Sequence, residues 1–160
     1  MNIMFLDFDG VVNTPMWDSS SQEFCMNMPY HGFVNNREAV RWIEAFCRVY
    51  NFQIVVSSDW RLNSSWRECL IFGGMSSDLI LDRTIHYSAS SELYGRGHEI
   101  QTWINEHPAI ENFIILDDDI SELLPHQLKH TIHTDSETGF TEWNFNQSIE
   151  KLYNGELKNE

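Results

Sequence analysis

Two aspartates, Asp7 and Asp9, stand one residue apart directly after the short apolar run Ile3–Leu6. Side chains alternate between the two sides of an extended chain, so both carboxylates point the same way and Phe8 points away. Neighbouring carboxylates repel each other, and keeping both ionised needs a compensating cation. A hard divalent ion that prefers oxygen ligands, Mg²⁺ above all, is the natural candidate. Gly10 follows and permits a sharp turn of the backbone.

Calcium loops and ordinary surface turns also contain the pattern Asp-x-Asp-Gly. An EF-hand loop needs Gly at its sixth position and Glu at its twelfth. Counted from Asp7, Gly10 is fourth and Asp18 is twelfth, so the pattern is not that of an EF-hand. An ordinary turn is the remaining alternative, although turns seldom follow an apolar strand and precede two valines, as Val11 and Val12 do here.

A second run of carboxylates, Asp117-Asp118-Asp119, follows the apolar stretch Asn112–Leu116. An isolated cluster of this kind is typical of a solvated helix start. After an apolar strand, it instead mirrors the opening stretch and offers a further ligand to the same cation. Because of the alternation, only one of Asp117 and Asp118 is expected to share the direction of the first pair. The other is expected to hold a metal-bound water or a basic side chain.

Hydroxyl groups stand at the end of another apolar run, Phe52–Val56, which is followed by Ser57 and Ser58. A serine at a strand end can donate a hydrogen bond to a phosphate oxygen, and backbone N–H groups at a helix start bind anions. The strand register favours Ser57 for this contact, with Ser58 next. Taken alone, the serines are equally typical of a helix start. Arg61, three residues after Ser58, either supplies a forked donor to phosphate or pairs with a surface carboxylate.

A basic residue, Arg96, stands at the amino end of a predicted helix over residues 95–104. Ile100, Trp103 and Ile104 recur at helical spacing and form the inner side of this helix. An arginine beside two glycines is usually a surface residue. The residue types alone leave open whether Arg96 lies on the surface or near the carboxylates.

The elements that must position these groups follow from the hydrophobic pattern. Apolar runs alternate with helical patterns, which predicts a three-layer, Rossmann-like α/β domain with a mainly parallel central sheet. In such sheets ligands bind beyond the carboxyl ends of the strands, where the aspartates and serines above all lie. Residues 79–81 and 85–87 form extended fragments without an assigned place. The other expected elements are a helix capped by Asn35-Asn36, a helix over 64–72, a short helix ending at 123–125, an edge strand over 130–134 and a last helix capped by Thr141.

A single domain is expected over residues 1–154, which is long enough to bury a sizeable core. Residues 13–36 are polar and irregular and follow the first carboxylate pair, so they are expected to form a flap over it. A disordered stretch is the alternative, which the aromatic and methionine residues argue against. Residues 155–160 form a polar tail that is expected to fray.

The formal net charge of −14 argues against a broad nucleic-acid-binding surface, which needs many lysines and arginines. A single nucleotide or a strand end remains a possible ligand, since a bound metal supplies local positive charge. The cysteines, Cys25, Cys47 and Cys69, show neither a disulfide framework nor zinc-ligand spacing. No apolar run reaches membrane-spanning length and no targeting peptide is recognisable, so no membrane partner is expected and the cytoplasm is the expected location. The oligomeric state is left open.

The stretch from Phe5 to Asn13 resembles the first motif of the haloacid dehalogenase-like (HAD) superfamily of phosphatases and phosphotransferases, a hydrophobic strand followed by Asp-x-Asp-Gly. Ser57, Arg96 and the pair Asp117-Asp118 stand where the second, third and fourth motifs of that superfamily are found. The resemblance implies a HAD-like fold with a small flap and no large cap domain. It also implies an enzyme, a Mg²⁺-dependent phosphomonoester hydrolase.

Roles for individual residues are implied by the same resemblance. Asp7 is the nucleophile that forms an aspartyl-phosphate, and Asp9 donates a proton to the leaving oxygen and later takes one from water. Mg²⁺ is held by Asp7, the backbone carbonyl of Asp9, and Asp117 or Asp118. Arg96 neutralises charge where the nucleophile and the phosphate meet. The phosphate is expected to be held by hydroxyl, guanidinium and backbone groups: Ser57, Ser58, Arg61, Arg96 and Gly10.

More narrowly, Ser57–Arg61, Arg96–Ile100 and Gly139–Thr141 resemble the small HAD domains of Swiss Army Knife RNA repair proteins. This resemblance implies nucleic-acid 3′-phosphate ends as substrates. The strongly acidic balance of the chain fits a polynucleotide poorly, so a phosphorylated small molecule is the other expected class of partner.

Two further functions stay open. One is a nucleotidase of free nucleoside monophosphates, with Trp17, Phe24 or Tyr30 stacking on the base. The other is a metal-binding partner module that has kept the fold and lost turnover. The presence of Asp9 argues against this module, because a pure metal site does not need this acid.

Overall fold

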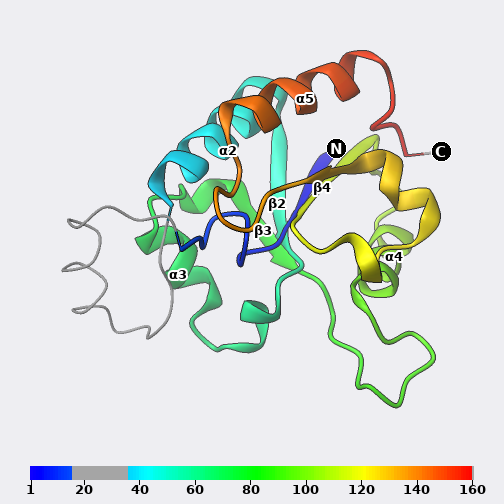
Figure 1. The fold of residues 1–160 in the computed structure, drawn as a ribbon. Helices are drawn as coiled ribbons and strands as arrows, with labels where there is room; N and C mark the ends of the chain where they lie inside the picture. The colour runs from blue at the N-terminus through cyan, green and yellow to red at the C-terminus, as the bar shows by residue number, and fades with distance from the viewer. Residues whose placement is uncertain (16–35, 160) are drawn as a thin grey trace.

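The sheet at the centre of the molecule contains five parallel strands within the described residues, in the order β3–β2–β1–β4–β5 (Figure 1). The structure is a computed structural model that describes residues 1–15 and 36–159. The strands are β1 (Asn2–Leu6), β2 (Phe52–Val56), β3 (Ile80–Arg83), β4 (Asn112–Asp117) and β5 (Thr131–His133). This arrangement confirms the predicted α/β class and the parallel sheet.

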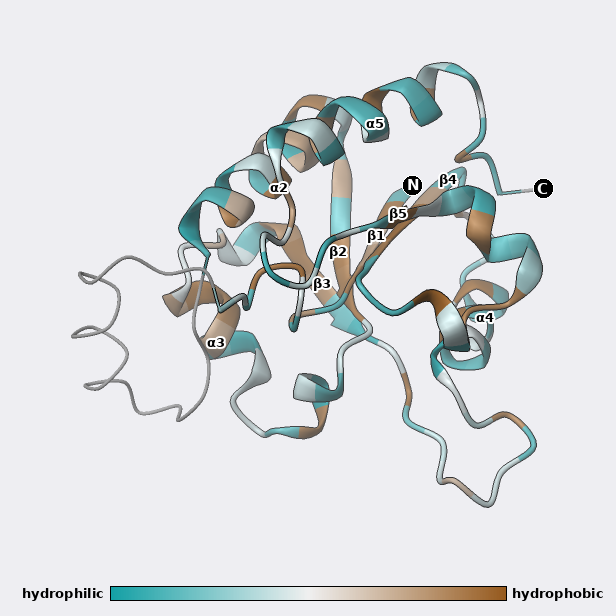
Figure 2. Ribbon diagram, viewed as in Figure 1, coloured by the Kyte–Doolittle hydropathy of each residue, from teal (hydrophilic) through white to brown (hydrophobic). Residues whose placement is uncertain are grey.

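Helices cover both faces of the sheet, which gives the three expected layers (Figure 1). The helices are α2 (Arg37–Tyr50), α3 (Trp66–Phe72), α4 (Arg96–Glu106) and α5 (Glu142–Tyr153). α2, α3 and α5 pack on one face, and α4 packs on the other. Along β1, Met4 and Leu6 belong to the first core, whereas Ile3 and Phe5 belong to the second, beside α4. Figure 2 shows β1 as hydrophobic and the outer side of α5 as largely hydrophilic.

α2 begins at the cap that the sequence predicts. The side chain of Asn36 accepts a hydrogen bond from the backbone N–H of Ala39 (3.1 Å). The helix ends at Asn51, which adopts the left-handed conformation (φ 57°) that asparagine tolerates better than most residues. Nδ2 of Asn36 also donates to the carbonyl of Thr138 (3.0 Å), which ties the helix start to the loop before α5.

Two segments differ from the expected elements. Residues 85–87 form no strand, because the backbone N–H of Tyr87 donates to Oε1 of Glu99 on α4 (3.0 Å) instead of to a strand. The short helix expected before Pro125 is a 3₁₀ turn at Ile120–Glu122, and a second 3₁₀ segment follows at Pro125–His130.

The expectation that the chain frays after Asn154 is wrong. Leu157 is fully buried in the first core, and its carbonyl accepts a hydrogen bond from the backbone N–H of Phe113 (2.8 Å). The backbone N–H of Asn159 donates to the carbonyl of Glu111 (2.9 Å). One apolar side chain among polar neighbours therefore fixes this segment beside the start of β4.

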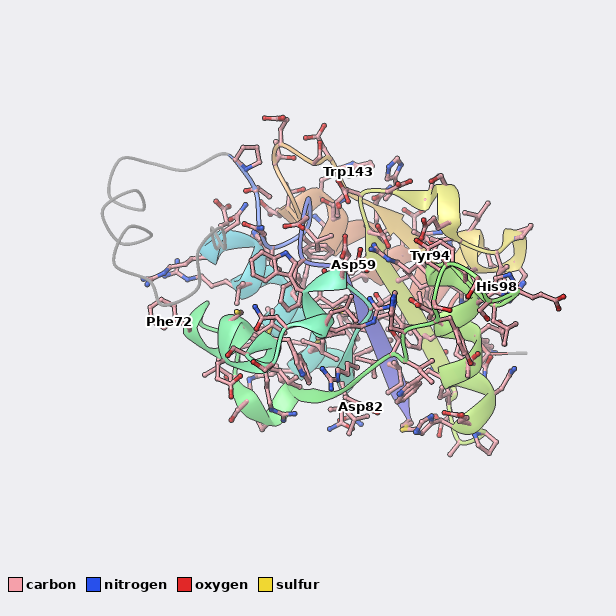
Figure 3. All side chains as sticks on the ribbon, turned by 90° about the horizontal axis from the view of Figure 1, so that it is seen from below. Asp59, Phe72, Asp82, Tyr94, His98 and Trp143 are labelled. Carbon is pink, nitrogen blue, oxygen red and sulfur yellow. The ribbon has the colours of Figure 1, made fainter. Side chains whose placement is uncertain are left out.

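The strand register brings three polar residues to one level of the sheet. Leu6 pairs with Val56 on one side and Leu116 on the other, so the next residue of each strand, Asp7, Ser57 or Asp117, lies at the same height. Each of these three comes two residues after a residue of the core beside α4: Phe5, Val55 or Ile115. Side chains two residues apart share a face of a sheet, so the polar three also face α4. Figure 3 shows the molecule from below the view of Figure 1 and labels Asp59, which follows β2, and Tyr94, which precedes α4.

Candidate active site

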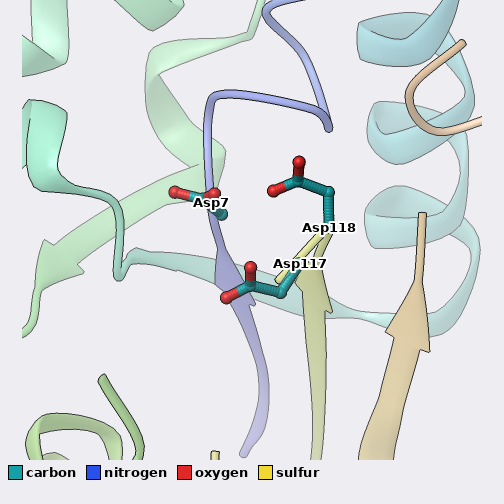
Figure 4. Close-up of side chains that lie close together, drawn as sticks. All are labelled: Asp7, Asp117 and Asp118. Atoms are coloured by element: carbon teal, nitrogen blue, oxygen red, sulfur yellow. The ribbon is translucent and has the colours of Figure 1, made fainter. Parts of the chain in front are cut away.

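Three carboxylates meet beyond β1 and β4 (Figure 4). One oxygen each of Asp7, Asp117 and Asp118 lies within 4.8 Å of the other two. Asp7 and Asp117 are buried, and Asp118 is half-buried. Oδ1 of Asp7 is buried and has no hydrogen-bond partner among the described residues. Since hard divalent cations take carboxylate oxygens as ligands, this donor set fits Mg²⁺.

Asp117 and Asp118 both contribute to this cluster, although alternation along a strand led us to expect only one. β4 ends at Asp117, so the position of Asp118 is set by the turn that follows. Gly10 makes room for Asp118: its φ is +67°, and a Cβ atom on it would lie 2.2 Å from Cγ of Asp118. Any side chain at residue 10 would therefore displace the Asp118 carboxylate.

The backbone of Gly10 is engaged within the protein. Its N–H donates to the carbonyl of Asn13 (2.8 Å), and its carbonyl accepts from the hydroxyl of Thr134 (2.7 Å). The expected phosphate-binding role of Gly10 therefore lacks a free backbone donor, and the structure gives this residue the role of shaping the turn.

Arg96 reaches the carboxylates from the first position of α4. Its Nη1 lies 2.7 Å from Oδ2 of Asp117 and 3.1 Å from Oδ2 of Asp7. Burial raises the pKa of the Asp7 carboxyl, and the positive charge of Arg96 opposes that rise. Burial likewise raises the pKa of Asp117 to about 6, again against Arg96 and with the help of the Asp7 charge. Arg96 thus lies where a positive charge is needed between two buried carboxylates.

Both serines of the loop after β2 lie beside Asp7. The Ser57 hydroxyl is fully buried and shares the level and face of Asp7. It has no hydrogen-bond partner within the described part of the chain. The Ser58 hydroxyl lies near enough to Asp7 to lower the pKa of that carboxyl, and it accepts a weak hydrogen bond from the backbone N–H of Trp60 (3.4 Å). The structure brings both candidate donors to the site.

Asp9 lies on the exposed side of the cluster and is held in place by its neighbours. The indole N–H of Trp60 lies 3.1 and 3.0 Å from the two carboxylate oxygens of Asp9, and Nδ2 of Asn13 donates to Oδ1. The Asp9 carboxylate is not one of the three carboxylates that meet, Asp7, Asp117 and Asp118. The expected contact of Asp9 with the metal is through its backbone carbonyl. No local sequence pattern predicts the contact between Trp60 and Asp9.

A hollow of about 500 Å³ opens beside Asp9. Its lining includes three acidic residues, Asp9, Asp118 and Glu137. No basic side chain among the described residues lines it. Asp118 belongs both to the carboxylate cluster and to the lining of this hollow.

Arg61 is buried and pairs with two carboxylates. Its Nη1 lies 3.3 Å from Oδ1 of the exposed Asp59, which is the expected pairing with a surface carboxylate. It also has a second, buried partner that the sequence did not predict. Its Nη2 pairs with Oε2 of Glu99 on α4, and its Nη1 donates to the carbonyls of Ser57 (3.1 Å) and Ser58 (2.7 Å). The guanidinium is therefore not open to a phosphate. Glu99 was missed, although a carboxylate next to Ile100 on the inner side of the helix was a signal for a buried partner.

The flap expected at residues 13–36 falls largely on residues 16–35, which lie outside the described part of the chain. Among the helices of the described part, none has the length and apolar character needed to cross a membrane.

A comparison with protein-family models gives one result that covers most of the chain. The model described as the HAD domain in Swiss Army Knife RNA repair proteins matches residues 3–145, a span that contains every site residue discussed above. No curated protein and no solved structure matches the chain. The chain therefore belongs to the family of HAD domains found in Swiss Army Knife RNA repair proteins.

Proposed function

We propose that this chain is a Mg²⁺-dependent phosphomonoester hydrolase that works through an aspartyl-phosphate on Asp7. The observation that carries the proposal is the meeting of three carboxylates with Arg96 at the carboxyl end of a parallel sheet. Membership of a HAD family supports a phosphatase-related role. Mg²⁺ would be held by the side chains of Asp7, Asp117 and Asp118 and by the backbone carbonyl of Asp9.

The first chemical step is attack by Asp7 on phosphorus. Its Oδ2 is paired with Arg96, and its Oδ1 has no hydrogen-bond partner in residues 1–15 and 36–159, so Oδ1 is the oxygen available for attack. The new Oδ1–P bond forms as the bond from phosphorus to the leaving oxygen breaks, and Asp9 gives that oxygen its proton. When bound, Mg²⁺ screens the repulsion between the Asp7 carboxylate and the anionic phosphate.

The second step regenerates the enzyme. A water molecule attacks the aspartyl-phosphate, and Asp9 takes the proton from that water, which releases inorganic phosphate and the free Asp7 carboxylate. Arg96 and the hydroxyl of Ser57 or Ser58 hold the phosphoryl oxygens in both steps, since all three groups lie beside Asp7.

The substrate proposed from the family description is a nucleic-acid end that carries a 3′-phosphate. The acidic hollow beside Asp9 favours the second candidate, a free nucleotide. A polynucleotide would bring further phosphates toward Asp118 and Glu137, and these like charges repel. A mononucleotide brings only the phosphate that is hydrolysed.

Hydrolysis of an aryl phosphate, followed with and without Mg²⁺, tests the reaction. Wild type should release phosphate only with Mg²⁺, and Asp7→Asn should be inactive. Equal activity in both proteins rules out Asp7 as the nucleophile. Comparing 3′-phosphorylated oligonucleotides with mononucleotides then decides between the substrate classes.

A metal-binding module without turnover is the alternative from a different class. The Asp7–Asp117–Asp118 cluster supports metal binding in either case. Mg²⁺ binding by wild type together with the absence of hydrolysis of every phosphomonoester offered would favour this module over the enzyme.

A further inference from the structure

We propose that the buried ion pair between Arg61 and Glu99 is a positioning device for phosphate binding, and that it sets the distance between the serine loop and Arg96. The inference rests on the proposed function, since it concerns how the same site holds a phosphoryl group. Neither residue touches the carboxylate cluster among the contacts of the described residues, so the pair acts through its neighbours.

Arg61 holds the loop that follows β2. Its Nη1 donates to the carbonyl oxygens of both Ser57 (3.1 Å) and Ser58 (2.7 Å). These are the two residues whose hydroxyls lie beside Asp7. Because a planar guanidinium offers several donors in a fixed geometry, it constrains both peptide units at once. The orientation of the serine hydroxyls therefore depends on the place of Arg61.

Glu99 holds the first turn of α4 and the segment that precedes it. Its Oε2 pairs with Arg61, and its Oε1 accepts from the backbone N–H of Tyr87 (3.0 Å) and lies 3.2 Å from Nδ1 of His86. Arg96 is one turn earlier on the same helix. Fixing Glu99 against Arg61 therefore fixes the helix end that carries Arg96.

The pair thus joins two segments that meet at the phosphate site. Asp59 and Tyr94, which mark these segments, lie on the same side of the molecule in Figure 3. One segment carries the hydroxyls and the other carries the guanidinium that would hold the phosphoryl oxygens. A displacement of about 1 Å between such groups can lower a rate about a hundredfold.

Stability alone does not account for this pair. Both side chains are almost completely buried, with 2% of Arg61 and 4% of Glu99 exposed. Burying two charges removes their hydration, and apolar residues of similar volume often replace such a pair without loss of stability. A charged pair at this place is therefore better explained by the geometry that it imposes.

The metal ligands are positioned by a different part of the fold. Asp7 and Asp117 are held by the hydrogen bonds between β1 and β4, and Asp118 is held against Gly10. Arg96 also contacts Asp7 and Asp117, so loss of the ion pair should weaken phosphate binding by more than it weakens Mg²⁺ binding. A loss of structure throughout the domain would weaken both alike.

The test uses Glu99→Gln and the double variant Arg61→Met/Glu99→Leu, each compared with wild type. The readouts are kcat and KM for an aryl phosphate, the Mg²⁺ concentration at half-saturation, the affinity for inorganic phosphate by calorimetry, and unfolding in urea. We expect both variants to lose about tenfold or more in kcat and in phosphate affinity, with a smaller change in the Mg²⁺ concentration at half-saturation. The double variant should unfold at a urea concentration closer to that of wild type than Glu99→Gln does.

Ile43→Val, on α2 across the sheet from α4, is the matched control, since it weakens the core away from the site. It should keep wild-type kcat and phosphate affinity. The inference is overturned if the double variant recovers kcat and phosphate affinity together with stability, or if Mg²⁺ binding falls in parallel with phosphate binding. A wild-type protein without hydrolysis overturns the proposed function, and phosphate affinity still decides the role of the pair. A wild type that binds no phosphate overturns both.

Discussion

Nη1 of Arg96 lies 2.7 Å from Oδ2 of Asp117, a partly buried contact between the first residue of α4 and the last residue of β4. The same nitrogen lies 3.1 Å from Oδ2 of Asp7. Removing one partner of a buried charge pair leaves the other charge uncompensated, which costs more than the pair itself contributes. Arg96 therefore offsets the charge of two carboxylates, Asp7 and Asp117, that are also proposed to take part in the reaction.

Two replacements of Arg96 test separately the contributions of its positive charge and of its planar guanidinium group. We expect Arg96→Met to lower kcat/KM for an aryl phosphate by about 100-fold to 1000-fold, the usual cost of removing one group that stabilises transition-state charge. Arg96→Lys should fall between this variant and wild type, because lysine keeps the charge and loses the planar fork. Arg48→Met, which breaks an exposed pair with Asp78, is the control and should have wild-type kinetics. Full activity in Arg96→Met would exclude the proposed role.

A methyl group added at residue 10 should weaken Mg²⁺ binding. Gly10→Ala places a Cβ where the Asp118 carboxylate lies, so we expect the Mg²⁺ concentration at half-saturation to rise about tenfold, the usual scale for a disturbed metal site. Gly74→Ala is the matched control: its φ is also positive (+102°), and nothing lies within 4 Å of the added Cβ. Both variants carry backbone strain, and only Gly10→Ala should lose Mg²⁺ affinity. The Mg²⁺ affinity of each variant is measured from the rise of its melting temperature with Mg²⁺ concentration. An equal loss of Mg²⁺ affinity in Gly10→Ala and Gly74→Ala would mean that backbone strain alone causes it.

Asp7→Asn should stabilise the metal-free protein. The pKa of Asp7 is raised by burial, so the folded state binds its proton more tightly than the unfolded state does, and stability is lost as the pH rises through the folded pKa. A neutral amide removes this cost, and Arg96 keeps Asp117 as its partner. We expect a higher melting temperature for Asp7→Asn than for wild type in EDTA at pH 7.5. Mg²⁺ should raise the melting temperature of wild type more than that of the variant, and the reverse order would contradict the assigned ligand.

His130 should make the protein sensitive to mild acid. It is buried, stacks on Phe113 with ring centroids 3.8 Å apart, and burial lowers its pKa to about 4. Since an unfolded histidine titrates near 6.5, the unfolded state binds the proton first, and stability falls between pH 6.5 and about 4. By linkage, this group should remove about 2 kcal/mol of stability between pH 7.5 and pH 5. Urea unfolding of His130→Phe should show a loss smaller by that amount, and identical pH profiles would contradict the assignment.

The sequence was sufficient where local pattern decides structure. The continuous apolar run Ile3–Leu6 predicted the buried strand β1, which the structure shows as Asn2–Leu6. The cap of α2 at Asn36 likewise depends on residues within one turn. Parallel strands end at the same edge, so the convergence of Asp7 with Asp117 followed from the fold class.

Contacts between distant segments could not be predicted from the same patterns. Arg61 and Glu99 are 38 residues apart, and nothing in either local pattern says that they meet. The position of Asp118, after β4, depends on the absence of a Cβ atom on Gly10, which follows the neighbouring strand β1. Leu157 is a single apolar residue in a polar segment, and only its tertiary contacts reveal that it is buried.

The covalent intermediate is the most direct test of the reaction. Wild type and Asp9→Asn would be mixed with an aryl phosphate and Mg²⁺, quenched in acid during turnover, and digested for mass spectrometry. We expect a phosphoryl group on the peptide that contains Asp7, more of it in Asp9→Asn, and none in EDTA or in Asp7→Asn. Turnover by wild type without phosphate on Asp7, or phosphate on another residue, would contradict the mechanism.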